Sequence, residues 1–145
     1  MGNRAVIRTN ENTLGVYLHW NGGRDTIEPV LAFCKASGYR SPEDDCYGWA
    51  YLCTVLGCFF GDGMNLGIDM VKRLDTDNDD NGTYIIEGWK IVGREFVSEG
   101  FKEQSEYVFA DMLKAINDQM PEHMRLTDEK MVEAIKEHAM EASVM

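Results

Sequence analysis

The residues best suited to chemistry lie in one stretch of the chain, LGVYLHWNGGRD at positions 14–25. An alternating strand there breaks at a double glycine, and a helix is expected almost at once, so backbone N–H groups are exposed where no Cβ is needed. Trp20 offers a flat apolar face, Asn21 offers an amide with donors and acceptors, and Arg24 offers a planar cation. This combination suits the binding of an aromatic, anionic small molecule such as a nucleotide, and it is not a catalytic set.

Arginine positions extend this hypothesis, because guanidinium is shaped to hold phosphate or carboxylate. Arg4, Arg24 and Arg94 each lie where a predicted strand meets a loop, the usual place for function. The alternative is that each arginine pairs with a surface carboxylate. In the binding hypothesis Trp20 stacks on a base, the glycine amides hold ribose or phosphate, and the arginines neutralise phosphates. The predicted ligand-binding residues are Trp20, Asn21, Gly22, Gly23, Arg24, Arg94 and Arg4.

An acidic segment, 75–82, resembles the start of a calcium loop. Asp77, Asp79, Asn81 and Gly82 match the first, third, fifth and sixth positions of an EF-hand loop, but the twelfth position, which should be Glu, is Gly88. The flanks also read as strands. A turn ending in Asn-Gly, a strong hairpin signal, is therefore favoured over a metal site.

Other catalytic or metal motifs are missing from the sequence. It holds no G-x-S-x-G, no H-E-x-x-H and no phosphate-binding Walker loop, and its three histidines are scattered. None of the four cysteines forms a C-x-x-C pair, so we expect reduced, packed thiols in a cytoplasmic protein. We therefore expect no enzyme activity, no catalytic residues, no cofactor and no metal, and no run of residues is long and apolar enough to span a membrane.

Charge narrows the choice of partners. The net charge of −11, from 14 basic and 25 acidic residues, argues against binding to nucleic-acid phosphates. It leaves two interpretations, an acidic surface that maintains solubility and one that docks on a basic surface of another protein. The second would make the protein an inhibitor acting through 75–80.

The elements that must position these residues follow from hydrophobic periodicity. Strands are predicted at 5–8, 15–20, 65–71, 83–86 and 89–94, and helices at about 26–37, 42–60, 105–119 and from 128 onward. The first two strands are expected to form an antiparallel hairpin, and Glu87-Gly88 is expected to form a bulge or tight bend between the last two. Asp25 or Thr26 is expected to cap the first helix, and Gly38 is expected to end it in the left-handed conformation. The apolar stripe of this helix is Ile27, Val30, Leu31 and Cys34. Ser41 is expected to cap the second, nearly all-apolar helix, and Thr127 the last one. Trp49 is expected in the core, and 97–104 is expected to be irregular.

These elements predict a single α+β domain over 1–145. It contains an antiparallel sheet of four or five strands, packed by the two helices of the N-terminal half, with further helices at the C-terminus. The helix within 121–145 is otherwise charged and is expected to be peripheral.

Several segments carry a resemblance, namely GNRAVI, YLHWNGGRD, CYGWA, DNG-x-YIIE and WKIVGRE. Over about residues 2–96 the chain resembles a family of short acidic proteins encoded by phages and integrative elements of gut Firmicutes. The resemblance implies an anti-defence role. One form is a sponge for a nucleotide-derived signal, similar to anti-Thoeris proteins, and the binding hypothesis implies a homo-oligomer because such sites often lie between subunits. The alternative is an acidic inhibitor of a nucleic-acid-binding effector, as among anti-CRISPR proteins.

Overall fold

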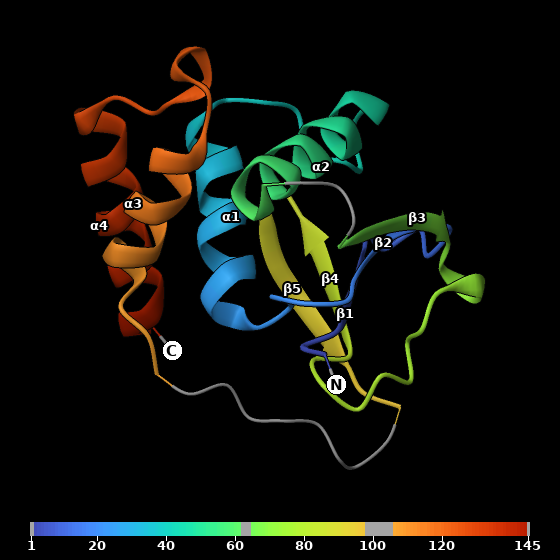
Figure 1. Ribbon diagram of the computed structural model, residues 1–145. Coiled ribbons are helices and arrows are strands. Elements are labelled where there is room, and N and C mark those ends of the chain that lie inside the picture. Colours follow the sequence, from blue (N-terminus) through green and yellow to red (C-terminus); the bar gives the residue numbers. More distant parts are fainter. Residues whose placement is uncertain (1, 62–64, 98–105, 145) are drawn as a thin grey trace.

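The computed structural model describes residues 2–61, 65–97 and 106–144, and they form an α+β fold (Figure 1). The strands are β1 (Ala5–Arg8), β2 (Leu14–Leu18), β3 (Leu66–Met70), β4 (Thr83–Glu87) and β5 (Lys90–Glu95). The helices are α1 (Arg24–Ala36), α2 (Cys46–Phe60), α3 (Phe109–Gln119) and α4 (Asp128–Val144), with short 3-10 turns η1 (Val71–Arg73) and η2 (Glu122–Met124).

The sheet is mixed, with strand order β3-β2-β1-β4-β5, so the prediction of a purely antiparallel sheet is wrong. The β1–β2 and β4–β5 hairpins are antiparallel as predicted, but β1 pairs with β4 in parallel, with Ile7 opposite Tyr84. The cause is the chain from β3 to β4, which crosses two strands before it returns to the sheet. A crossover of this kind brings strands into parallel pairing, which no local turn signal encodes.

One face of the sheet belongs to the hydrophobic core. Ile7, Val16 and Tyr84 are fully buried and join a cluster that includes Ile27 of α1 and Leu52 of α2. Alternation along the strands places these side chains on one face. Figure 1 shows the helices gathered together beside the sheet, with α3 and α4 on the far side of α1.

The opposite face is crossed by the connection 71–82. Gly15 points away from the core face, and a Cβ there would lie 3.0 Å from a methyl group of Leu74 and 3.1 Å from one of Val71. Farther along, the Asn81 amide donates to the Arg4 carbonyl at 3.0 Å. The acidic segment is therefore a strand connection that ends at Asn81-Gly82, as predicted, and it packs against the sheet. It is not a hairpin turn, because β3 and β4 are not neighbours in the sheet.

Helix starts differ from the predictions because other groups cap them. The N-cap of α1 is Gly23, and neither Asp25 nor Thr26 caps it. For α2 the cap is Asp45, whose carboxylate accepts the Tyr47 N–H at 3.0 Å, so the helix starts at Cys46 rather than near Pro42. The predicted apolar stripe of α1 is buried as expected.

The structure of the C-terminal half confirms part of what the sequence predicts. The Thr127 hydroxyl accepts the Lys130 N–H at 3.2 Å at the start of α4, which confirms the predicted cap. Along α4, Ala134 is buried whereas Val132 is 50% exposed. The predicted irregular segment 97–104 falls, apart from its first residue, outside the described residues. No helix in the described ranges has the length and hydropathy needed to cross a bilayer.

Candidate functional site

The predicted site begins at Trp20, whose side chain is 50% exposed. Its backbone is held by Asn65, which accepts the Trp20 N–H at 2.6 Å and donates to the Trp20 carbonyl at 2.8 Å. The His19 ring meets the indole edge-on at 5.1 Å between centroids. Asn21 follows in the left-handed region with φ of +60°. Trp20 and Asn21 are thus accessible, as the hypothesis requires.

The double glycine is buried and serves the fold. The Gly22 N–H donates to the Asn3 carbonyl at 2.7 Å, and its own carbonyl accepts the Tyr84 hydroxyl at 2.8 Å. A Cβ on Gly22 would lie 2.6 Å from the Asn3 carbonyl oxygen and 2.7 Å from the Ala5 Cβ. Glycine is therefore required by close backbone approach, and the Gly22 amide is not available to a ligand.

Each arginine of the predicted set has a partner within the chain. Arg24 pairs with Glu28 at 3.1 Å, one helical turn away. Arg4 pairs with Asp80 at 2.8 Å, and this hydrogen bond raises the pKa of the Arg4 guanidinium. These contacts match the alternative stated for the arginines, pairing with acids.

Arg94 is held differently, by an aromatic face and a carbonyl. Its guanidinium carbon lies 3.9 Å from the centroid of the Tyr84 ring, and its Nη2 donates to the Asn81 carbonyl at 2.7 Å. Burial lowers the pKa of this guanidinium. Stacking on a buried tyrosine is a cation–π contact that fixes the side chain against the sheet.

The acidic segment is organised from within by Asn78, which is 1% exposed. Its amide nitrogen donates to the Asp75 carbonyl at 2.9 Å, and its oxygen accepts the N–H groups of Asp80 and Gly82. The uncharged side chain of Asn78 thus holds the centre of this loop together. In a calcium loop the ion would do so. No cluster of three metal-binding side chains was found in the parts of the chain that the structure describes.

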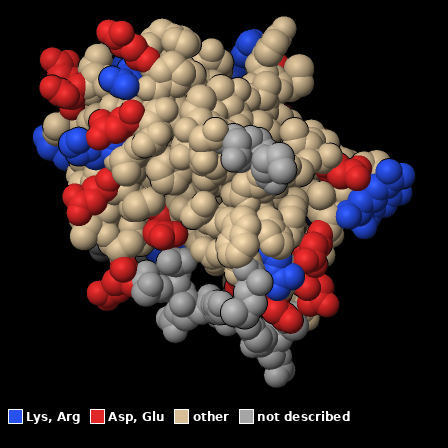
Figure 2. Space-filling model, viewed as in Figure 1, with Lys and Arg blue, Asp and Glu red and all other residues tan. Residues whose placement is uncertain are grey.

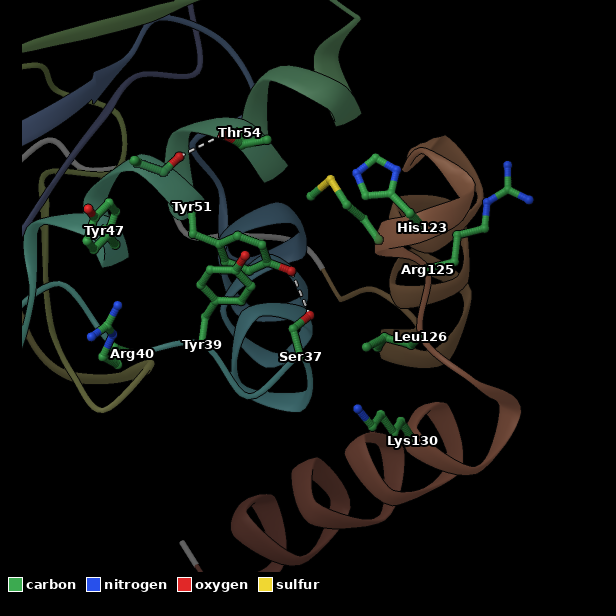
Figure 3. Close-up of a pocket in the computed structure, with 12 residues that line it drawn as sticks. Ser37, Tyr39, Arg40, Tyr47, Tyr51, Thr54, His123, Arg125, Leu126 and Lys130 are labelled. Atoms are coloured by element: carbon green, nitrogen blue, oxygen red, sulfur yellow. Dashed lines mark hydrogen bonds between the residues drawn. The ribbon is translucent and has the colours of Figure 1, made fainter.

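A cavity of about 650 Å³ lies between α2 and the segment 123–130 (Figure 3). Its size falls within the range of about 300–1,000 Å³ typical of small-molecule sites. The lining residues are Ser37, Tyr39, Arg40, Tyr47, Ala50, Tyr51, Thr54, His123, Met124, Arg125, Leu126 and Lys130. No carboxylate belongs to this lining among the described residues, although the chain as a whole has 25 acids.

A stacked tyrosine pair forms one wall of this cavity. The rings of Tyr39 and Tyr51 are parallel within 4°, with centroids 3.8 Å apart. Tyr51 is 8% exposed and donates its hydroxyl to Ser37 at 2.7 Å, and burial raises the pKa of Tyr51 to about 12. Tyr39 is 51% exposed, so the pair presents a fixed aromatic surface to the solvent side.

Basic side chains lie around the tyrosine pair. Figure 3 shows Lys130 extending from α4 toward the tyrosines and His123 extending toward α2. Arg40 and Arg125 also line the cavity, and both have partners elsewhere in the chain. An aromatic wall facing cationic groups is the arrangement expected of a site for a planar anion.

The loop that carries Tyr39 is fastened to the β4–β5 turn. The Trp89 indole N–H donates to the Tyr39 carbonyl at 2.8 Å, and the Glu43 carboxylate accepts the Gly88 N–H at 2.9 Å. Trp89 lies in the left-handed region with φ of +62° and is 4% exposed. A bulky residue rarely adopts this conformation, so the surrounding contacts must hold it there.

A second cavity, of about 750 Å³, lies between α1, α4 and the β4–β5 turn. Its rim is crossed by ion pairs, in which Glu137 of α4 contacts Lys35 and Lys90, and Lys90 also reaches Glu141 at 2.7 Å. Acids therefore compensate Lys35 and Lys90 at this rim. Lys130 lines this cavity as well as the first one, beside Glu133 and Glu137, but it forms no ion pair with them. Arg24 belongs to the lining of this second cavity.

The predicted set is therefore not gathered around one hollow. Trp20, Asn21, Arg94 and Arg4 line neither cavity. Gly22 and Arg94 both contact Tyr84, whereas Trp20 is held by Asn65 and Arg4 by Asp80. Their role in ligand binding stays a prediction.

Sequence reasoning missed the tyrosine cavity because its walls come from segments about 80 residues apart. One signal was available, since Tyr39, Tyr47 and Tyr51 recur around the start of α2. The cysteines also differ from expectation, because Cys46 is exposed although Cys34 is buried. Comparison with protein-family models, curated proteins and solved structures found no match for this chain.

Proposed function

We propose that this protein binds a planar, anionic small molecule of the nucleotide class in the tyrosine cavity and retains it without converting it. The observation that carries the proposal is the juxtaposition of the Tyr39–Tyr51 stack with Lys130 and His123 in a cavity whose described lining contains no carboxylate. In a chain of net charge −11, a cavity lining without carboxylates reduces the repulsion that an anion would meet there.

Stacking supplies the aromatic part of recognition. One face of Tyr39 is covered by Tyr51, and the ring remains half exposed, so a planar base can extend the stack. Stacking of a base on an aromatic side chain contributes about 1–3 kcal/mol. The proposed ligand belongs to the same class as the one expected from Trp20 and the double glycine, but its proposed site is the tyrosine cavity.

The biological role we propose is sequestration. A phage or mobile-element protein that retains a nucleotide-derived signalling molecule would deny that molecule to a host defence receptor. A homo-oligomer would raise the number of sites in each particle. To retain a ligand without converting it, the protein needs only to stack on its ring and pair with its charge. Tyr39 and Lys130 can make these two contacts.

The second candidate is an acidic inhibitor that docks on a basic protein surface. It is supported by Asp77 and Asp79, which are exposed on the connection 71–82. Figure 2 shows acidic side chains in separate groups on the face in view, several of them beside basic ones. Reversal of charge at both aspartates should weaken such an inhibitor, with affinity falling as salt rises, and should leave small-molecule binding unchanged.

Thermal unfolding with added nucleosides and nucleotides tests the first proposal. A ligand at about 100 times its Kd stabilises the folded state by about 2.7 kcal/mol, which raises Tm by several degrees. We expect a rise with at least one nucleotide and its loss in Tyr39→Ala. An unchanged Tm across nucleotides of all four common bases would contradict the proposal.

A further inference from the structure

We infer that the ligand of the tyrosine cavity carries a single anionic group, one phosphate or one carboxylate, rather than a diphosphate or triphosphate. This inference rests on the proposed function and goes beyond it by setting the charge of the ligand. The basic side chains in the lining are Arg40, Arg125, Lys130 and His123, and they differ in whether another group of the chain already balances their charge.

The charge of Arg40 is balanced by an acid. Its Nη1 lies 3.1 Å from a carboxylate oxygen of Asp45, and its guanidinium carbon lies 5.4 Å from the centroid of the Tyr47 ring. Asp45 is fixed in turn because its carboxylate caps α2. The pair is nearly neutral as a unit, so it adds little attraction for an anion even if Arg40 rotates. In Figure 3, Arg40 and Tyr47 lie on the opposite side of the tyrosine stack from Lys130.

Arg125 is turned toward the end of α3. Its Nε donates to the Met120 carbonyl at 3.0 Å, and its Nη2 donates to the Asp118 carbonyl at 3.5 Å. The last carbonyls of a helix carry partial negative charge, which a guanidinium there offsets. Figure 3 shows the Arg125 side chain extending away from the tyrosine pair. Its charge therefore offsets the partial negative charge at the end of α3 and is directed away from a ligand in the cavity.

Lys130 and His123 therefore remain for the ligand. Within the described residues neither side chain has an acidic partner. In Figure 3 His123 and Lys130 lie on opposite sides of Leu126, so they do not meet at one point, and Lys130 is the one that extends toward the tyrosine pair. Its ammonium has three donors, which match a single phosphate or carboxylate. A triphosphate would leave most of its charge without a partner inside a protein of net charge −11.

Lys130 lies at the end of the segment 123–130, across the cavity from the aromatic wall. The anionic group of the ligand is thus placed at one end of the cavity and its ring at the other, on Tyr39. A nucleoside monophosphate, or a cyclic nucleotide with one phosphate, has this form.

Calorimetric titration of the full chain, in buffer free of divalent cations, tests the inference. The probes are adenosine, AMP and ATP, with the guanosine series beside them. We expect the monophosphate of the preferred base to bind at least about tenfold more tightly than its nucleoside, because one charge-assisted hydrogen bond contributes about that much affinity. ATP or GTP should bind no more tightly than the corresponding monophosphate.

Variants locate the contact. Lys130→Met should reduce the affinity for the monophosphate to that for the nucleoside, and Lys136→Met, at an exposed position of the same helix, should leave it unchanged. A triphosphate that binds about tenfold more tightly than the monophosphate, or equal loss in both lysine variants, overturns the inference and leaves the proposed function standing. Absence of binding by every probe overturns both.

Discussion

Trp89 donates its indole N–H to the backbone carbonyl of Tyr39 across fifty positions of sequence, at 2.8 Å. The same indole meets the Tyr51 ring edge-on, with centroids 6.4 Å apart. One residue in a strained turn therefore contacts both members of the aromatic wall. The wall is fixed before any ligand arrives, which reduces the entropy lost on binding.

Removal of that hydrogen bond should destabilise the protein. Trp89→Phe keeps an aromatic ring and the left-handed backbone but leaves the Tyr39 carbonyl without its donor, so we expect a loss of about 1–2 kcal/mol in the free energy of unfolding. Urea unfolding measures it. Trp20→Phe, at a half-exposed indole, is the control and should change little. Equal stability of the two variants would show that the Trp89 contact is unimportant.

The double glycine should be intolerant of a methyl group. Gly22→Ala places a Cβ against backbone and Ala5, and overpacking of this kind costs about 1–3 kcal/mol. Gly67→Ala is the matched control, since a Cβ there meets only Tyr17, at 3.7 Å. If both variants unfold at the same urea concentration as the wild type, Gly22 is not constrained by packing.

The pairing of Arg4 with Asp80 should matter more than the exposed acids of the same loop. The Asp80 side chain is 8% exposed, and Asp80→Asn would leave the Arg4 guanidinium with only Asp75, a more exposed acid 3.4 Å away, so we expect a loss of about 1–3 kcal/mol. Asp77→Asn, at an exposed position, should lie within about 0.5 kcal/mol of the wild type. Because Asn78 occupies the loop centre, millimolar calcium should not change Tm in either variant.

Alkaline pH should weaken the fold through buried tyrosines. Burial raises the pKa of Tyr51 from 10.0 to about 12, so this hydroxyl stays protonated in the folded state at a pH where it ionises in the unfolded state. Its contribution is complete below pH 10 and is lost as pH rises from 10 to 12. Burial raises the pKa of Tyr84 and Tyr107 as well.

Tyr51→Phe should therefore flatten the fall in unfolding free energy between pH 10 and pH 12, and Tyr47→Phe, at a ring 61% exposed, should not. Urea titrations at several pH values across this interval provide the measurement. A slope that is the same in Tyr51→Phe and the wild type would contradict the assignment.

Patterns local in sequence were predicted well. The β1–β2 hairpin, the apolar stripe of α1, the left-handed Gly38 after it and the Thr127 cap all follow from residues close together in the chain. The parallel pairing of β1 with β4 was not predicted, because it depends on where the connection from β3 returns to the sheet. Such pairing is set by packing rather than by any turn residue.

The candidate site was predicted less well for a related reason. The sequence hypothesis named an aromatic face beside cations, and the proposed cavity has the same kinds of side chain. The arginines named in that hypothesis contact Glu28, Asp80 and the Tyr84 ring instead. In an acidic chain most cations find internal partners. Lys130 combines two properties that appear only in three dimensions: it extends toward the tyrosine pair, and it has no acidic partner within the described residues.

The central claim is that the tyrosine cavity, and not the double-glycine junction, holds an anionic aromatic ligand. Calorimetric titration of a nucleoside monophosphate into the wild type, Tyr39→Ala and Trp20→Ala tests it most directly. We predict that Tyr39→Ala loses about tenfold or more in affinity, which corresponds to the free energy contributed by stacking one base on an aromatic side chain. Trp20→Ala should bind the monophosphate as the wild type does. The reverse pattern, with binding lost in Trp20→Ala and kept in Tyr39→Ala, would contradict the account.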